Sequence, residues 1–192
     1  MMQAATHPAG LARRLMTMAA LGALIASQAV LAQVVASAPS DVEVRAAFLY
    51  RFLDYVEWER AHLDADQPIV IGVVGSDEML DQVRKTVAGR RAHGHPIEVR
   101  KMALGDDPTA IQVVYVGASS SAALATIAKR AQAASALVVT NADNALALGS
   151  DINFIEADGH VRFEVDLSNV ERSGLKLGSG MLSVALRVRG AS

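Results

Sequence analysis

Two short turns rich in glycine and serine are the positions where this sequence could bind a small molecule. Gly75 and Ser76 follow one apolar run, and Gly117 and Ser119 follow another. In open α/β folds ligands bind at the carboxyl ends of the strands, where backbone amides and hydroxyls can hold a small anion. An ordinary capped turn explains the same residues. The sequence has no G-x-G-x-x-G or Walker motif, so it gives no support for nucleotide binding.

Histidines and carboxylates are the other side chains that could carry chemistry. His93 and His95 are separated by one glycine. A metal site would need at least one more ligand, and a solvated loop explains the pair equally well. Glu164 and Asp166 alternate with apolar residues, which is typical of the exposed face of a strand. The sequence therefore predicts no metal site and gives these carboxylates no acid–base role.

Patterns for nucleophilic catalysis are also absent from the sequence. There is no cysteine, which excludes thiol catalysis, and no G-x-S-x-G elbow. The serines at 119–121 have no base close to them in the chain. A hydrolase would require such a base to approach in three dimensions. We predict a protein that is not an enzyme and that uses no cofactor.

Charge is nearly balanced, with 18 Lys and Arg against 20 Asp and Glu. A general nucleic-acid binder normally shows a large basic excess, so this balance argues against one. Basic residues nevertheless crowd one region in which Glu98 is the only acid. They could face an acidic partner, or they could simply be solvated. This group comprises Arg84, Lys85, Arg90, Arg91, Arg100 and Lys101.

The first 32 residues are typical of a secretory signal peptide. Arg13 and Arg14 precede an apolar run over residues 15–25, and small residues suit cleavage before Gln33. An uncleaved membrane anchor is the alternative, but the run is shorter than the roughly 20 residues that span a bilayer. We expect an exported, periplasmic protein with a linker at residues 33–40.

The chain beyond this linker begins with an amphipathic helix. Ser40 and Glu43 form an S-x-x-E capping box, and the apolar periodicity predicts a helix that continues to about Trp58. Phe48 and Tyr55 belong to a second apolar strip beside the main one. A helix with so broad an apolar face must bury both strips or offer one to a partner.

Alternating strands and helices follow. Apolar runs at 69–75, 111–116 and 136–140 predict strands buried on both faces, and residues 97–102 predict a half-exposed strand. Helices are expected at 77–87 and 122–133, and segments 152–157 and 160–166 form a hairpin about Asp158 and Gly159. Short terminal helices begin at Ser168 and after Gly178. The order predicts an α/β fold: a single Rossmann-like domain over residues 41–190, with a helix-flanked, largely parallel (mixed) sheet, a C-terminal hairpin and terminal helices.

Motifs at both ends of this domain resemble a known family. The stretch A-A-F-L-Y-R-F at 46–52, followed by V-E-W at 56–58, resembles the opening signature of the YfiR-type periplasmic proteins. The segments I-N-F-I at 152–155, V-R-F-E-V at 161–165 and S-G-L-K-L at 173–177 are similar to the family's closing pattern. The resemblance covers about residues 41–190. The two end motifs together are fairly specific.

The resemblance implies a negative regulator of an inner-membrane diguanylate cyclase, which lowers cyclic di-GMP output and biofilm growth by binding the periplasmic sensor domain of the cyclase. It also implies a homodimer, and a repressor that an outer-membrane lipoprotein can sequester. The chain departs from the family in having no cysteine for a redox switch. Asp166 stands where the family usually has Asn, and Ser150-Asp151 replaces the usual Gly-Gly.

We hypothesise that the first helix and the 152–166 hairpin contact the sensor domain or a second copy of the chain. The alternative is a periplasmic small-ligand-binding sensory module that uses the two glycine–serine turns. The residues predicted to bind the partner are Phe48, Arg51, Tyr55, Trp58, Arg162, Glu164 and Asp166, and those predicted to bind the ligand are Gly75, Ser76, Gly117 and Ser119.

Overall fold

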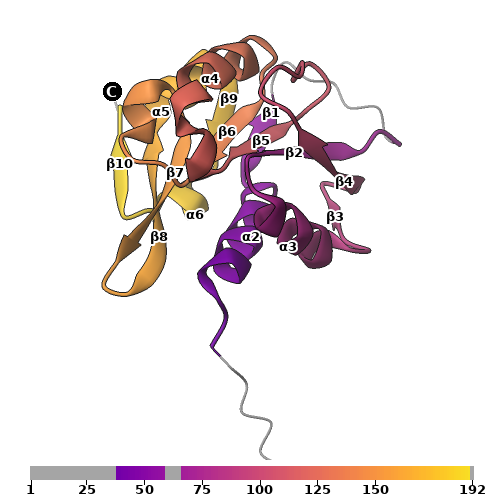
Figure 1. The fold of residues 1–192 in the computed structure, drawn as a ribbon, viewed down its shortest axis with the longest axis horizontal. Coiled ribbons are helices and arrows are strands. Elements are labelled where there is room, and N and C mark those ends of the chain that lie inside the picture. Colours follow the sequence, from indigo (N-terminus) through magenta and orange to yellow (C-terminus); the bar gives the residue numbers. More distant parts are fainter. Residues whose placement is uncertain (1–37, 59–65, 191–192) are drawn as a thin grey trace, which may run out of the picture. The chain divides into compact units, whose positions relative to one another are not determined.

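The computed structural model describes residues 38–58 and 66–190, and Figure 1 shows their fold. From Pro39 onward the chain forms one compact unit. The predicted signal peptide at residues 1–32 lies outside the described residues, as does most of the predicted linker at 33–40.

The centre of the main sheet is built from parallel strands buried on both faces. These are β2 (Ile69–Val74), β5 (Val113–Val116) and β6 (Leu137–Thr140), in which every residue is buried. Branched apolar residues favour such strands because they pack well on a pleated surface. The half-exposed β4 (His95–Met102) pairs with β2, also in parallel.

The strands at the two edges run in mixed directions. β7 (Ile152–Ala157) and β8 (His160–Asp166) form the expected antiparallel hairpin, whose Asp158 and Gly159 both have positive φ. That conformation suits a type I′ turn. β10 (Arg187–Arg189) runs parallel to β8, and β3 (Arg91–Ala92) runs antiparallel to β4. Within the described residues the sheet has eight strands, in the order β10-β8-β7-β6-β5-β2-β4-β3.

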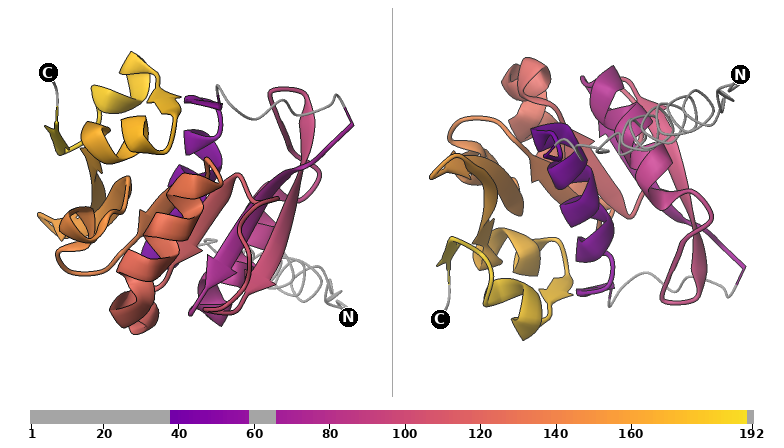
Figure 2. Two further views of the ribbon diagram at one scale, coloured as in Figure 1. Left: turned by 90° about the horizontal axis from the view of Figure 1, so that it is seen from above. Right: turned by 90° about the horizontal axis from the view of Figure 1, so that it is seen from below.

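Helices cover both faces of the sheet. In Figure 1, α2 (Asp41–Phe52) and α3 (Asp77–Val87) lie below it, and α4 (Leu124–Ala133) lies above it after the 3₁₀ turn η2 (Ala118–Ala123). The view from below in Figure 2 shows α2 between α3 and the β7–β8 hairpin. The remaining elements are η3 (Ala145–Leu148), α5 (Leu167–Arg172), β9 (Leu175–Leu177) and α6 (Ser179–Leu182). The predicted fold class is confirmed.

The first helix is shorter than its apolar periodicity predicts. It has the capping box of Ser40 and Glu43, but it ends at Phe52 with Leu53 as its C-cap. Residues Val56–Trp58 form β1, which pairs antiparallel with β9. The predicted extension to Trp58 is wrong because pairing with a distant strand outweighs local periodicity. The helix predicted after Gly178 spans only Ser179–Leu182, and residues 187–189 join the sheet as β10.

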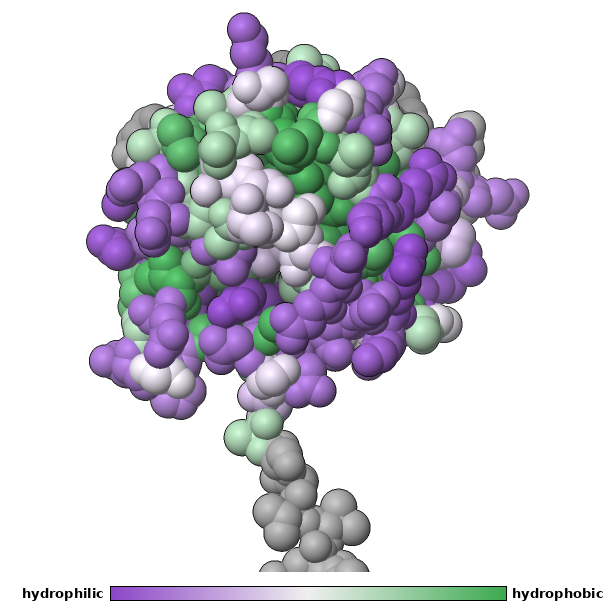
Figure 3. Space-filling model, in the orientation of Figure 1, coloured by the Kyte–Doolittle hydropathy of each residue, from purple (hydrophilic) through white to green (hydrophobic). Residues whose placement is uncertain are grey.

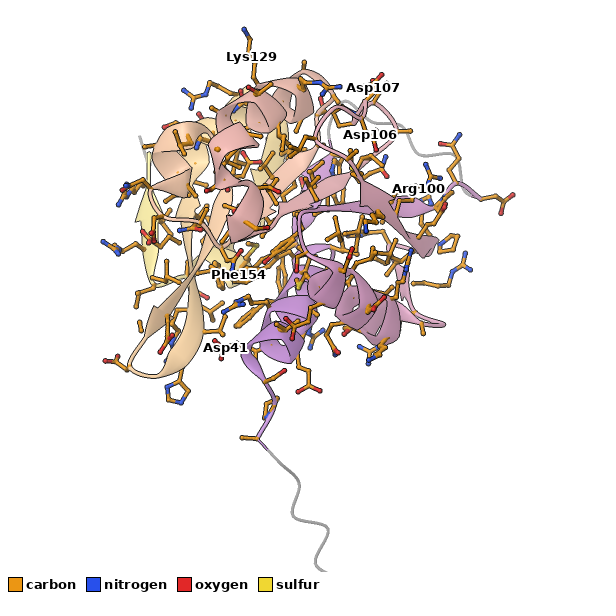
Figure 4. The ribbon with its side chains drawn as sticks, viewed as in Figure 1. Asp41, Arg100, Asp106, Asp107, Lys129 and Phe154 are labelled. Atoms are coloured by element: carbon orange, nitrogen blue, oxygen red, sulfur yellow. The ribbon has the colours of Figure 1, made fainter. Side chains whose placement is uncertain are left out.

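Four phenylalanines hold α2 on the hairpin. Phe48 and Phe52 come from α2, and their rings lie 5.4 and 5.0 Å from that of Phe163 in edge-to-face geometry. Phe154 stacks on Phe52 at 5.7 Å. Edge-to-face and offset pairs add stability beyond the burial of ring area. Figure 4 shows Phe154 in the space between α2 and the hairpin.

A buried carboxyl group links β6, β7, β8 and α5. Asp151 is fully buried; its Oδ2 accepts a 2.6 Å hydrogen bond from the Val138 amide, and Ser173 Oγ donates to Oδ1 at 3.3 Å. The amide of Asp166 donates to the Asp151 carbonyl at 3.0 Å. Burial raises the pKa of Asp151 to about 7, although these hydrogen bonds and the nearby Arg172 act to lower it.

Truncation of the aromatic cluster tests how α2 is anchored. Phe163 is 1% exposed, so Phe163→Ala should lower the free energy of unfolding by about 3–5 kcal/mol. Phe48→Ala should cost less, because Phe48 is only half-buried. Urea denaturation of the two variants measures the difference. Equal losses of unfolding free energy in the two variants would contradict the prediction that the more deeply buried Phe163 contributes more to stability.

The buried carboxyl group predicts a specific dependence of stability on pH. The folded pKa of Asp151 lies above its ordinary value of 3.8, so its stabilising contribution is complete below that value and is lost as pH rises to about 7. Over that range the wild type should lose up to about 4 kcal/mol relative to Asp151→Asn. Urea denaturation between pH 4 and 8 measures both proteins. Parallel stability curves would contradict the prediction.

Candidate functional site

A shallow, open apolar depression lies along one face of α2, and the described residues that line it all belong to α2 or to the segment just before it. Its walls are Val44, Ala47 and Phe48, together with Pro39 and the stems of Glu43 and Arg51, and its volume is about 330 Å³. The head groups of the two charged residues are engaged elsewhere: Glu43 accepts from the Ser40 amide at 2.7 Å, and Arg51 pairs with Asp54 at 3.5 Å. Long charged side chains commonly cover apolar surface in this way. We call this feature the apolar groove.

Phe48 therefore serves two surfaces. One side of its ring packs in the aromatic cluster, and another lines the apolar groove. Arg51, at the end of the groove, has a side chain that is 70% exposed. Of the predicted partner-binding residues, Phe48 and Arg51 are thus the two that the structure brings together in this groove.

Tyr55 and Trp58 lie beyond the C-terminal end of α2, away from the apolar groove. Tyr55 is 41% exposed and packs on Gly180, where an added Cβ would lie 3.1 Å from its Cε1. Trp58 is half-buried, and its Nε1 donates to the Gln112 carbonyl at 3.3 Å. The indole is therefore used partly to join β1 to the segment before β5.

The predicted residues of the hairpin have different environments. Arg162 is exposed on β8. The expected exposure of Glu164 is wrong, because β10 covers it: the Glu164 side chain is 8% exposed and lies 3.3 Å from Arg187 Nε and 3.7 Å from Arg189. Asp166 is half-buried and caps α5 by accepting from the Asn169 amide. The alternation of apolar and charged residues along β8 gave no indication that β10 covers Glu164.

The four predicted ligand-binding residues meet at one edge of the sheet. β2 and β5 are neighbouring parallel strands, but the helices that follow them cover opposite faces of the sheet. The chain therefore leaves the carboxyl ends of these two strands in opposite directions. Gly75, Ser76, Gly117 and Ser119 line a cavity of about 200 Å³ there. Arg45, Tyr115 and Asn141 also line it. We call it the switch-point pocket, after the position that ligands favour in open α/β sheets.

Most polar atoms of the switch-point pocket already bond within the two turns. Ser119 Oγ donates to the Gly75 carbonyl at 2.6 Å, and Ser76 Oγ accepts from the Met79 amide at 3.2 Å as the cap of α3. Asn141 Oδ1 accepts from both the Tyr115 hydroxyl and the Ala118 amide at 3.0 Å. Burial raises the pKa of Tyr115 to about 12, so its hydroxyl stays protonated as a donor.

Close approach of the two turns explains the two glycines. A Cβ on Gly117 would lie 2.8 Å from the Gly75 carbonyl oxygen, and Gly75 itself has a φ of +73°. Arg45 is held by Asp41 at 3.1 Å, and Glu78 adds a carboxylate to the lining. An acid at this position disfavours an anion. The capped-turn interpretation accounts for this geometry without a ligand.

The two histidines considered above, and a pair of adjacent acids at 106 and 107, also have hydrogen-bond partners in the structure. His93 Nε2 lies 2.7 Å from the Leu53 carbonyl oxygen and His95 Nδ1 lies 3.0 Å from that of Gln67. No group of three or more His, Cys, Asp or Glu suited to a metal occurs in the part of the chain that the structure describes. Asp106 and Asp107, labelled in Figure 4, accept hydrogen bonds from the backbone of their own turn.

The basic group is partly neutralised by neighbouring acids, one of which comes from a different element. Lys101 of β4 lies 2.6 Å from Asp77 of α3, and Arg84 lies 3.7 Å from Asp81. Arg100 pairs with Glu98 at 2.8 Å, and its hydrogen bond lowers the pKa of that carboxyl. Figure 3 shows a hydrophilic surface over α3. This arrangement favours a solvated, mixed-charge surface over an anion-binding patch.

Comparison with solved structures supports the fold. A conserved domain protein from Vibrio cholerae O1 biovar El Tor strain N16961 aligns with a TM-score of 0.56 and 14% identity. The alignment covers 78% of this chain and 60% of that protein, so the chain spans less than two thirds of its relative. This likeness concerns the fold alone.

Sequence comparison defines the family. Curated protein sequences gave no match to the chain. Within the described residues, no helix has the length and apolar character needed to cross a membrane. A family model described as YfiR/HmsC-like matches residues 42–186, well over half of the chain. The resemblance carried by the two end motifs is thus confirmed, and the chain belongs to the YfiR/HmsC-like family.

Proposed function

We propose that this protein is a periplasmic regulator that represses an inner-membrane diguanylate cyclase by binding its periplasmic sensor domain. Membership of the YfiR/HmsC-like family is the observation that carries the proposal. Export by a cleavable signal peptide, a homodimeric state and sequestration by an outer-membrane lipoprotein belong to the same proposal. We also propose that the protein is not an enzyme.

The apolar groove is the surface that best supports binding of a partner. Val44, Ala47 and Phe48 offer apolar area on a rigid helix, and Arg51 stands at the end of the groove. Aromatic and arginine side chains dominate the energetics of protein interfaces. The helix is also fixed against the hairpin by the aromatic cluster, so a partner would meet a preorganised surface. Tyr55 and Arg162 are exposed outside this groove and belong to the same proposal as further contacts of the partner.

Repression imposes a thermodynamic condition on this surface. The protein must bind the inactive state of the sensor more tightly than the active state, because equal affinities shift no equilibrium. Release must also be regulated without disulfide chemistry, since the chain has no cysteine. A reversible competitor for the same surface, such as the lipoprotein, would provide this regulated release.

A charge placed in the apolar groove should weaken repression. Ala47 is exposed on α2, so Ala47→Arg should fold but would bury an unpaired charge in the complex. We expect at least tenfold weaker binding to the purified sensor domain, which corresponds to about 1.4 kcal/mol. In cells that lack the gene, complementation with this variant should leave cyclic di-GMP high.

Ala125→Arg is the matched control. Ala125 is also an exposed helical alanine, but it lies on α4, on the opposite face of the sheet. This variant should restore repression as well as the wild type does. If deletion of the gene leaves cyclic di-GMP unchanged, the regulatory function is wrong. If the two arginine variants repress equally well, the function stands but the apolar groove is not the surface.

A further inference from the structure

The two edge strands of the main sheet differ in the apolar surface that they expose. β3 forms one edge and β10 the other, as Figure 1 shows for β10 beside β8. Six large apolar side chains are exposed in the described part of the chain, and three of them, Val184, Leu186 and Val188, lie in or just before β10. None of the six lies on β3. Exposed apolar residues therefore gather at the β10 edge.

The backbone of β10 is paired on one side. β10 runs parallel to β8 over three residue pairs, and no other strand of residues 38–58 and 66–190 pairs with it. All three of its residues are exposed. The outer side of an edge strand presents amide and carbonyl groups that can pair with a strand of another chain. The β10 edge is thus accessible to such a strand.

The two faces of β10 carry different side chains. Arg187 is the register partner of Glu164, so Arg187 and Arg189 share one face of the sheet, and Val188 lies on the other. The two arginines lie 3.3 and 3.7 Å from the single carboxylate of Glu164, which leaves an excess positive charge on their face. Their side chains are 58% and 53% exposed. Guanidinium groups in this position can bind further carboxylates.

These charges disfavour a second copy of the chain at the β10 edge. Antiparallel pairing of two copies centred on Val188 would place Arg187 of each copy opposite Arg189 of the other. Like charges directly opposite each other in a sheet are destabilising, whereas opposite charges are stabilising. A strand with carboxylates at these two positions and an apolar residue between them has the complementary pattern.

We propose that the β10 edge binds an extended segment of another protein in which acidic and apolar residues alternate. The segment would add a strand to the sheet, so that its backbone bonds to β10 and its side chains determine specificity. Its carboxylates would pair with Arg187 and Arg189, and its apolar residue would pack beside Val188. This surface is separate from the apolar groove on α2, and the inference does not depend on the proposed function.

Titration with three capped peptides tests the chemistry of the segment. The first has the sequence T-V-E-V-E-V-T, the second has lysine in place of both glutamates, and the third is the first with N-methyl groups on two adjacent central residues, which block both of its edges. Amide chemical shifts of the purified protein should give a dissociation constant at least tenfold lower for the first peptide than for the other two. The proposal is overturned by equal binding of the glutamate and lysine peptides, by retained binding of the N-methylated peptide, or by no binding of the first up to about 5 mM, near the weak limit of specific affinity.

Variants at the two edges of the sheet locate the binding. Arg189→Gln should weaken binding of the glutamate peptide at least fivefold. Arg91→Gln is the matched control, because Arg91 is an exposed arginine of the other edge strand, and it should leave binding unchanged. The reverse pattern would place the peptide elsewhere and overturn the assignment. Shifts of the β10 amides that depend on protein concentration without peptide would assign the edge to a second copy, and would equally overturn it.

Discussion

The burial of Asp151 constrains the C-terminal half of the sheet. A carboxyl group that water cannot reach must keep its hydrogen bonds, and its partners come from β6 and from the end of α5. A shift of one residue in the register of β7 would turn its buried side chains to the other face and break these bonds. The same register places Asn153 opposite Glu164 and Phe154 opposite Phe163. One buried group thus helps to define both faces of the hairpin.

The fold was predictable where local sequence determines structure. Strands β2, β5 and β6 are continuous apolar runs, and α3 begins at a serine cap followed by acids, so their patterns needed no distant partner. The three-residue strands β1, β9 and β10 have no such pattern. They exist because a partner strand is present, which a local pattern cannot report. The predicted first helix is too long for this reason. Val56 continues the apolar periodicity of the helix, but in the structure it belongs to β1 and pairs with Leu177 of β9.

The candidate sites were predictable to different degrees. The glycine–serine turns meet because parallel strands end at the same edge of a sheet, which is a rule of topology. The structure adds the reason for the glycines, namely the close approach of Gly117 to the Gly75 carbonyl. The environment of Glu164 was not predictable, because β10 had no signal in the sequence. Without β10, the alternation along β8 assigns Glu164 to solvent, whereas two arginines of β10 enclose it.

The two faces of the hairpin have different partners. Phe154 and Phe163 pack on α2, whose Phe48 lines the apolar groove, while the adjacent Glu164 pairs with Arg187 and Arg189 of β10. Consecutive residues of a strand point to opposite faces, so these two sets of contacts share a backbone but no side chain. A change in the contacts of β10 would therefore affect the proposed partner surface only by favouring one position of that backbone over another. The size of such an effect is limited by the difference in affinity of the partner for the two positions.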